Sequence, residues 1–144
     1  MNKGMAIIVA GSREFDNYEL LRDVCDMYTR DRDDVTIISG GARGADKLGE
    51  DYSIERGFKL LRIEAEWNEY GKSAGYRRNC DMAITANSYV DRMCIAFSVN
   101  KSKGTNHMIN ICKRYNVPCL KVELTDDSPT GVVATYYENK EEDK

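Results

Sequence analysis

Three short segments of this sequence combine glycine, hydroxyl and basic residues directly after an apolar run. They are Gly11-Ser12-Arg13, the run Ser39-Gly40-Gly41-Ala42-Arg43-Gly44-Ala45-Asp46, and Asn100-Lys101-Ser102-Lys103-Gly104-Thr105. Glycines at a strand-to-helix junction let the backbone bring its N–H groups close to a ligand, and the helix start adds oriented donors and a partial positive charge. These residue types predict phosphate binding. The glycine segment is neither a properly spaced G-x-G-x-x-G nor a Walker A motif, which argues against a simple dinucleotide dehydrogenase or kinase.

The basic residues of these segments stand out against an acidic chain. The 144 residues hold 21 Lys and Arg against 24 Asp and Glu, giving a net charge of -3 and a pI near 5.3. This balance excludes a protein built mainly as a polycation. With a fourth segment, residues 67–79, seven cations are expected on one edge of the molecule: Arg13, Arg43, Lys72, Arg77, Arg78, Lys101 and Lys103. Such a concentration of charge predicts a compact anionic ligand.

Several side chains near these segments could take part in catalysis. The candidates are Asp46, Glu66, Arg78 and Asp81, and Glu64 also flanks the end of an apolar run. Asp46 could equally be the dipole partner of its helix or pair with Arg43. Ser12 and Ser39 have no partner base, which favours hydroxyl contacts to phosphate. A single histidine, His107, is insufficient for a metal site, so no metal is expected, and the residues leave open whether a ligand is turned over.

The elements that position these residues alternate between short apolar runs and amphipathic stretches. The apolar runs cover residues 5–10, 35–39, 58–63, 93–97 and 118–124. Helices are expected after Asp16, which has Glu19 in capping-box spacing, then over 45–56, over 75–87, and from Thr105 onward. This alternation predicts an α/β, Rossmann-like three-layer sandwich with a five-stranded, mostly parallel sheet in the order 3-2-1-4-5. The ligand is expected where the loops after the first, second and fourth strands converge.

The composition is that of an ordinary globular domain, expected over residues 1–124, followed by an extension over 125–144. The extension is expected to add a short strand through Val132, Val133, Thr135 and Tyr136 at an oligomer contact, and then a solvated charged tail. The short apolar run near the N-terminus has no cleavage-site pattern, which favours a cytoplasmic protein. Five cysteines without a C-x-x-C pair indicate buried free thiols.

Taken together, these motifs resemble the YspA/YpsA-related branch of the SLOG superfamily, which includes the LOG phosphoribohydrolases and the DprA DNA-processing proteins. The resemblance covers about residues 5–124 in order, including Glu66-Trp67 and the segment from Ala74 to Met82 with its Arg78-Asn79 pair. It implies a Rossmann-like fold that binds nucleotides or nucleotide-derived ligands, often as a dimer or larger oligomer. Members of this branch are often found in phage and bacterial conflict settings.

The sequence departs from the LOG pattern where that pattern supplies catalysis. Gly104 and Thr105 match the LOG motif, but Met108 stands where LOG enzymes have a glutamate, and residues 98–103 replace a proline-glycine-glycine stretch. Hydrolysis of an N-glycosidic bond needs a carboxylate to stabilise the oxocarbenium ion or to activate water. The LOG mechanism therefore does not transfer intact.

The favoured hypothesis is a protein that binds, senses or sequesters a nucleotide-type phosphate ligand: an NAD or ADP-ribose derivative, a mononucleotide or a cyclic nucleotide. The alternatives are a nucleotide hydrolase, acting on an N-glycosidic or phosphoester bond, and DprA-like binding of single-stranded nucleic acid, against which the acidic pI stands. No membrane partner is expected. The protein is expected to form a homodimer or a larger homo-oligomer. Trp67 either stacks on a base or packs over its loop, and Asn79 orders the loop or touches a sugar. The predicted ligand-binding residues are Gly11, Ser12, Arg13, Ser39, Gly40, Gly41, Ala42, Arg43, Gly44, Asp46, Trp67, Arg78, Asn79, Lys101, Ser102, Lys103, Gly104 and Thr105.

Overall fold

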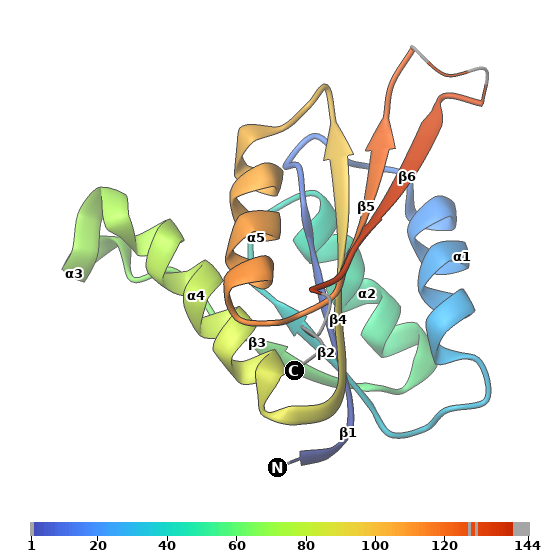
Figure 1. Cartoon of the computed structure of the whole chain (residues 1–144), viewed down its shortest axis with the longest axis horizontal. Helices are drawn as coiled ribbons and strands as arrows, with labels where there is room; N and C mark the ends of the chain where they lie inside the picture. The colour runs from blue at the N-terminus through green and yellow to red at the C-terminus, as the bar shows by residue number, and fades with distance from the viewer. Residues whose placement is uncertain (1, 127, 129, 140–144) are drawn as a thin grey trace, which may run out of the picture.

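A computed structural model describes residues 2–126, 128 and 130–139. Its single sheet has the strand order β3-β2-β1-β4-β5-β6, and only the β5–β6 pair is antiparallel (Figure 1). The strands are β1 (Asn2–Gly11), β2 (Val35–Ser39), β3 (Lys59–Arg62), β4 (Tyr89–Val99), β5 (Cys119–Leu124) and β6 (Val132–Tyr137). The predicted α/β class and the order 3-2-1-4-5 are confirmed, and β6 extends the sheet beyond β5.

Helices cover both faces of the sheet. They are α1 (Tyr18–Thr29), α2 (Ala45–Arg56), α3 (Trp67–Tyr70), the 3-10 turn η1 (Gly71–Ser73), α4 (Ala74–Asn87) and α5 (Lys103–Arg114). α1 and α2 pack on one face, and α4 and α5 pack on the other (Figure 1). α3 and the start of α4 project beyond the sheet. None of the helices in the described part of the chain is long and apolar enough to cross a membrane.

The core consists of two apolar layers separated by β1 and β4. Ile7 and Val9 of β1 belong to the layer under α1 and α2, whereas Ala6 and Ile8 belong to the layer under α4 and α5. This alternation is that of a strand covered on both faces. All five cysteines are free thiols and only Cys80 is not fully buried, which confirms the prediction of buried free thiols.

The structure corrects two local predictions. The N-cap of α1 is Asn17 rather than Asp16, because the Asn17 side chain accepts the Leu20 N–H at 3.1 Å. The capping-box spacing of Asp16 and Glu19 is therefore off by one residue. All four residues of β3 are exposed rather than buried, since β3 is an edge strand. The predicted charged tail falls partly on residues 140–144, which lie outside the described residues.

Candidate functional site

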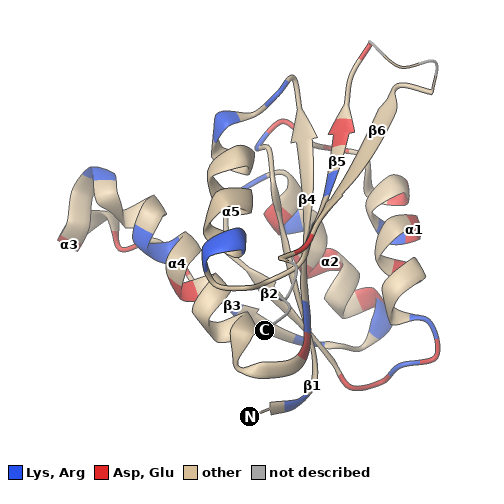
Figure 2. Ribbon diagram, in the orientation of Figure 1, with Lys and Arg blue, Asp and Glu red and all other residues tan. Residues whose placement is uncertain are grey.

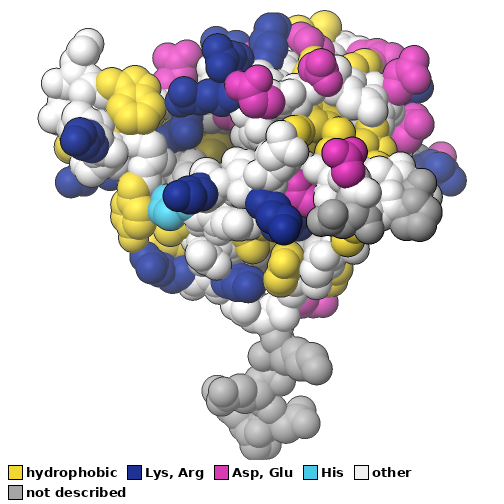
Figure 3. Space-filling view, turned by 90° about the horizontal axis from the view of Figure 1, so that it is seen from above, with side chains coloured by type: hydrophobic (Ala, Val, Ile, Leu, Met, Phe, Trp, Pro, Cys, Tyr) yellow, Lys and Arg dark blue, Asp and Glu magenta, His cyan; other side chains and the backbone are white. Residues whose placement is uncertain are grey.

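The carboxyl ends of β1, β2 and β4 meet at one edge of the sheet, the upper edge in Figure 1. Because β2 and β4 lie on opposite sides of β1, the strand order reverses here, and a ligand crevice is expected at such a point. Figure 2 shows Lys and Arg on the loops of this edge. The view from above in Figure 3 shows Lys and Arg side chains around a hollow.

Two neighbouring pockets open at this edge. The first, which we call the α5 pocket, has a volume of about 400 Å³ and is lined by Ala10, Gly11, Ser12, Arg13, Glu14, Ala42, Asp46, Arg78, Asn79, Met82, Ser102, Gly104 and Met108. The second, the Trp67 pocket, has a volume of about 430 Å³ and is lined by Arg13, Gly40, Gly41, Ala42, Arg43, Glu64, Ala65, Trp67 and Arg78. Arg13, Ala42 and Arg78 line both, so the pockets share a wall.

Two glycines let backbone segments of the site approach each other closely: Gly11 lies against β4, and Gly44 lies against the loop after β1. A Cβ on Gly11 would lie 2.0 Å from the Phe97 carbonyl oxygen, and one on Gly44 would lie 2.3 Å from the Ser12 carbonyl oxygen. Both glycines have positive φ, +149° and +79°, which disfavours any other residue. The Ser12 carbonyl then accepts the Ala45 N–H at 3.2 Å, which ties the β1 loop to the start of α2.

Asp46 is a buried carboxyl group in the first turn of α2, and only 4% of it is exposed. Its Oδ2 accepts the Ala42 N–H at 3.3 Å. Burial raises the pKa of Asp46 to about 6, although the Ala42 hydrogen bond and the nearby Arg78 charge oppose the shift. The structure therefore places a carboxyl group in the α5 pocket that can exchange a proton near neutral pH.

Arg78 lies between the two pockets and is only partly bound by the protein. One terminal nitrogen, Nη1, donates to the Gly40 carbonyl at 3.1 Å. Its Nε is buried without a hydrogen-bond partner among the described residues. A Cβ on Gly40 would lie 2.9 Å from Arg78 Cδ, so the glycine makes room for this arginine. A buried donor without a partner is costly unless a ligand or water completes it.

The start of α5 forms the far wall of the α5 pocket. The Ser102 side chain caps the helix by accepting the Thr105 N–H at 3.3 Å. Thr105 is 2% exposed, and its Oγ1 has no hydrogen-bond partner among the described residues. A helix N-terminus with an unused hydroxyl suits an anion.

Other predicted residues lie outside the pocket linings. They are Ser39, Gly44, Lys101, Lys103 and Thr105, together with the catalytic candidates Glu66 and Asp81, both of which are exposed. Ser39 is fully buried behind the glycine loop, where its hydroxyl donates to Glu50 at 2.7 Å and accepts the Gly41 N–H at 3.1 Å. Arg62 in turn donates to Glu50, so Ser39 links the glycine loop to this ion pair and thereby supports the loop.

The charge at the pockets is mixed rather than strongly positive. Of the seven predicted cations, only Arg13, Arg43 and Arg78 line a pocket, and the linings also contain Glu14, Glu64 and Asp46. Arg43 pairs with Glu14 at 3.2 Å, and Arg77 instead lies over the Tyr70 ring, 4.2 Å from its centroid. Three of the seven cations expected at this edge therefore line the two pockets, and which of them contact a ligand stays a prediction.

Several residues that line the pockets were not predicted as ligand contacts from the sequence: Ala10, Glu14, Ala65, Met82 and Met108. The two methionines lie on the apolar faces of α4 and α5, a pattern that indicates core. Asn79 has an unexpected partner as well, because its Nδ2 lies 3.0 Å from Nδ1 of His107. Burial lowers the pKa of His107, which favours the neutral ring.

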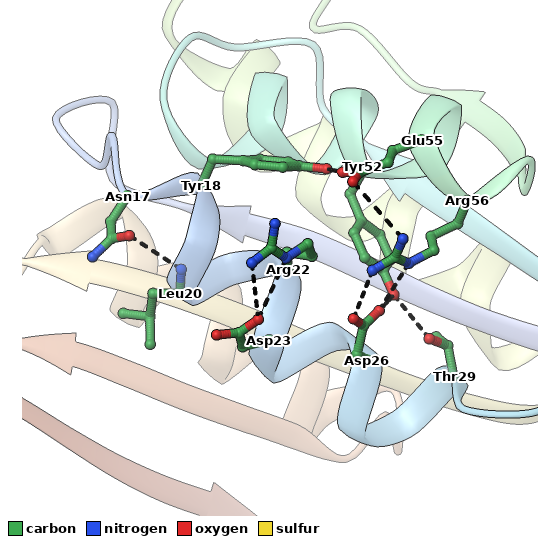
Figure 4. Close-up of polar contacts among 10 residues, drawn as sticks. All are labelled: Asn17, Tyr18, Leu20, Arg22, Asp23, Asp26, Thr29, Tyr52, Glu55 and Arg56. Atoms are coloured by element: carbon green, nitrogen blue, oxygen red, sulfur yellow. Dashed lines mark hydrogen bonds and ion pairs between the residues drawn. The ribbon is translucent and has the colours of Figure 1, made fainter.

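A separate polar cluster joins α1 to α2, on the face of the sheet opposite to α4 and α5 (Figure 4). The Tyr52 hydroxyl donates to Asp26 at 2.6 Å and lies 2.8 Å from the Thr29 hydroxyl. Arg56 holds both oxygens of Asp26, at 3.0 and 2.7 Å. These groups hydrogen-bond to one another, so the role of the cluster is to hold the two helices together.

The fold and the two pockets define a Rossmann-like α/β protein with a crevice at the reversal of strand order. Residues 5–70 match the profile of the family described as YAcAr, the YspA, cpYpsA-related SLOG family. This match confirms the resemblance over residues 5–70. The match includes the loops after β1 and β2 and ends before Arg78 and the start of α5.

A phage protein is a distant homologue of this chain. The Gene 61 protein of Mycobacterium phage D29 is 28% identical over 120 residues, which cover 79% of this chain and 93% of the phage protein. The similarity therefore extends beyond the segment that matches the family profile.

Proposed function

We propose that the protein binds a nucleotide or a nucleotide-derived phosphate ligand across the two pockets. The observation that carries the proposal is Arg78, which stands in the wall shared by both pockets with a buried Nε that has no partner among the described residues. A phosphate oxygen at this wall would accept from Nε and from the Arg13 guanidinium. The SLOG domain over residues 5–70 supports the same class of ligand.

The mixed charge supports a nucleotide over simple phosphate. Arginine donors suit phosphate oxygens, whereas the carboxylates of Glu14, Glu64 and Asp46 can accept from ribose hydroxyls or base amino groups. Trp67 lines one pocket and is 51% exposed, so its indole is open to stacking on a base. Together these groups offer partners to each part of a nucleotide.

The test is thermal unfolding and calorimetric titration with ADP-ribose and AMP, with adenosine as the probe that lacks phosphate. A ligand at 100 times its dissociation constant adds about 2.7 kcal/mol of stability, so a clear rise in the melting temperature is expected for the phosphorylated probes. Arg13→Gln should weaken their binding about tenfold, since one charge-assisted hydrogen bond contributes about 1.5 kcal/mol or more.

The matched control is Arg22→Gln, an arginine on α1 whose one ion pair with a described residue is to the neighbouring Asp23 and which lines neither pocket. It should leave affinity unchanged. No stabilisation by either phosphorylated probe at millimolar concentration, or equal loss in the two variants, would contradict the proposal.

Hydrolysis of the bound nucleotide is a second candidate, favoured by Asp46 alone. With its pKa raised to about 6, Asp46 is partly protonated near neutral pH and lines the α5 pocket. In this reaction water bonds to the anomeric carbon, the bond to the base breaks, and Asp46 gives its proton to the base and regains one from the water. Chromatography of AMP after prolonged incubation should then show free base, and Asp46→Asn should abolish it. Unchanged AMP at high protein concentration would exclude this candidate for AMP.

A further inference from the structure

The two outermost strands of the sheet, β3 and β6, differ in how they are protected from pairing with another chain. At one edge, β3 is four residues long and carries a charge at each end, Lys59 and Arg62. Short length and basic residues are the usual devices that prevent an edge strand from pairing with another chain. At the other edge, β6 has six residues, VVATYY, with no charge, glycine or proline. The β6 edge lacks these devices.

The ladder between β5 and β6 fixes which backbone groups of β6 face outward. The Thr125 N–H donates to the Gly131 carbonyl at 2.9 Å, in the same register that pairs Glu123 with Val133 and Lys121 with Thr135. In an antiparallel pair, alternate residues exchange both hydrogen bonds. The odd-numbered residues of β6 therefore face β5, and the backbone groups of Val132, Ala134 and Tyr136 face away from the sheet.

These outward groups are not all available. The Val132 carbonyl accepts from the Thr130 hydroxyl at 3.1 Å, and its N–H donates to the same hydroxyl at 3.4 Å. For Ala134 and Tyr136, no described residue supplies a backbone partner on the outer side. The exposed backbone of β6 thus consists of two residues at alternate positions, beside half-exposed side chains of Val133 and Tyr136.

We propose that two copies of the chain pair antiparallel through β6, with Thr135 on the two-fold axis. In this register Ala134 of one copy exchanges both hydrogen bonds with Tyr136 of the other, so the two free positions satisfy each other and Val132 keeps its contacts with Thr130. Thr135 faces Thr135 of the second copy, and Val133 faces Tyr137. Threonine pairs and pairs of β-branched with aromatic residues are among the favourable cross-strand pairs.

A second copy fits this edge better than an unrelated strand on grounds of charge and symmetry. A two-fold interface places each group opposite its own kind or a fixed partner, so charged residues on the axis would repel. Residues 132–137 contain none. A six-residue strand is about 20 Å long, and sheets are about 10 Å thick, so the contact is smaller than the roughly 800 Å² per partner of a standard interface. The dimer is therefore expected to be weak and concentration-dependent, in the micromolar range or above.

Sedimentation velocity over a wide concentration range tests the pairing with the full chain. Ala134→Pro removes an outward N–H but leaves the residues that face β5 unchanged, so the variant should sediment as a monomer with an unaltered melting temperature. Thr135→Lys should also give a monomer, since it sets two like charges opposite each other, and high salt should partly restore the dimer. A native chain that remains monomeric at every concentration, or dimers that persist in both variants, would overturn the proposal.

Crosslinking tests the register itself. Residues facing each other at a non-hydrogen-bonded position lie about 4.5 Å apart between Cα atoms, within reach of a disulfide. With oxidised glutathione as the oxidant, Thr135→Cys should form a covalent dimer, with glutathione released as the thiol. Val133→Cys is the matched control, because Val133 of the two copies would be roughly 14 Å apart along the strand. Equal crosslinking of the two variants would exclude this register.

Discussion

The α1–α2 cluster and the two-pocket edge both contain buried polar groups, but of the two regions the edge alone leaves some of the described ones without a partner. Tyr52, Asp26, Thr29 and Arg56 are mutually hydrogen-bonded. At the edge, Arg78 Nε and Thr105 Oγ1 are buried without partners among the described residues. An unpartnered buried polar group costs free energy unless a ligand or water completes it, and under the proposed function this partner would be the ligand. The polar groups of the cluster thus stabilise the fold, whereas under the proposed function those of the edge are groups that a ligand would complete.

The two regions also shift the pKa of their aspartates in opposite directions. The Arg56 guanidinium lowers the pKa of Asp26, so this carboxylate stabilises the fold above its ordinary pKa and loses that contribution as the pH falls. Burial raises the pKa of Asp46 to about 6. The folded state therefore holds the Asp46 proton more tightly than the unfolded state, and stability falls as pH rises from about 4 to about 6.

The largest expected effect is that of Asp46→Asn on stability. A pKa raised from 3.8 to about 6 corresponds to a cost of up to about 3 kcal/mol once the carboxyl is ionised. The asparagine carries no charge and can still accept the Ala42 N–H, so the variant should be more stable than the native chain at pH 8 and equal to it at pH 4. Urea unfolding at the two pH values measures this.

The control for this experiment is Asp23→Asn, a carboxylate with 69% of its side chain exposed. Its effect should be within about 0.5 kcal/mol at both pH values. If Asp46→Asn destabilised the chain at pH 8, Asp46 would belong with the cluster residues as a group that holds the fold.

The next effect is that of Arg78→Met on ligand affinity. Removing a charged donor at the shared wall should weaken ADP-ribose or AMP about 10- to 100-fold, because hydrogen bonds to charged groups contribute about 1.5–3 kcal/mol. The melting temperature should fall modestly, since the side chain loses its bond to Gly40 and the positive charge that favours ionised Asp46. Arg77→Met is the neighbouring control, on a side chain that lies over Tyr70 and lines neither pocket. Equal losses by calorimetry in both variants would show a general charge effect instead of a site.

The smallest effect is that of Tyr52→Phe. The change removes the donor to Asp26 and leaves the Thr29 hydroxyl without its buried partner, so the free energy of unfolding should fall by about 1–2 kcal/mol while ligand affinity stays unchanged. Tyr18→Phe, whose hydroxyl bonds Glu55 at an exposed position, should cost less. A loss of ligand binding in Tyr52→Phe would break the separation between the two regions.

The strand order was predictable because it depends on regular features. Alternating apolar runs and amphipathic stretches predict a parallel sheet, and Gly44 of the glycine loop is the N-cap of α2, which begins at Ala45 as expected. The predicted N-cap of α1 is wrong by one residue. Asp16 and Asn17 are both favourable N-cap residues, and only the backbone conformation before the helix decides which of them caps it. Arg13 and Arg78 were predicted as phosphate ligands, but the wall that they share depends on how α4 approaches the β2 loop, which no local pattern records.

The charge of the edge was the least predictable property. Counting cations by loop gave seven, yet Arg43 is paired with Glu14 and Arg77 lies over an aromatic ring. Such pairings arise from side-chain directions that a sequence does not contain. Ser39 illustrates the same limit, because a buried hydroxyl that bonds Glu50 and one that faces a ligand look alike in the sequence.

The Gly11 and Gly44 contacts have a consequence for how this protein could diverge. Both positions lie against backbone atoms of another segment, so an alanine at either would displace a neighbouring chain rather than a single side chain. The backbone frame of the site, formed by Gly11, Gly44 and the segments they contact, therefore does not tolerate single substitutions at these two glycines. Glu14 and Trp67 are exposed side chains on its rim, and either can vary without moving the frame. Under the proposed function, a change of ligand would therefore come through these two positions while the loops stay as they are.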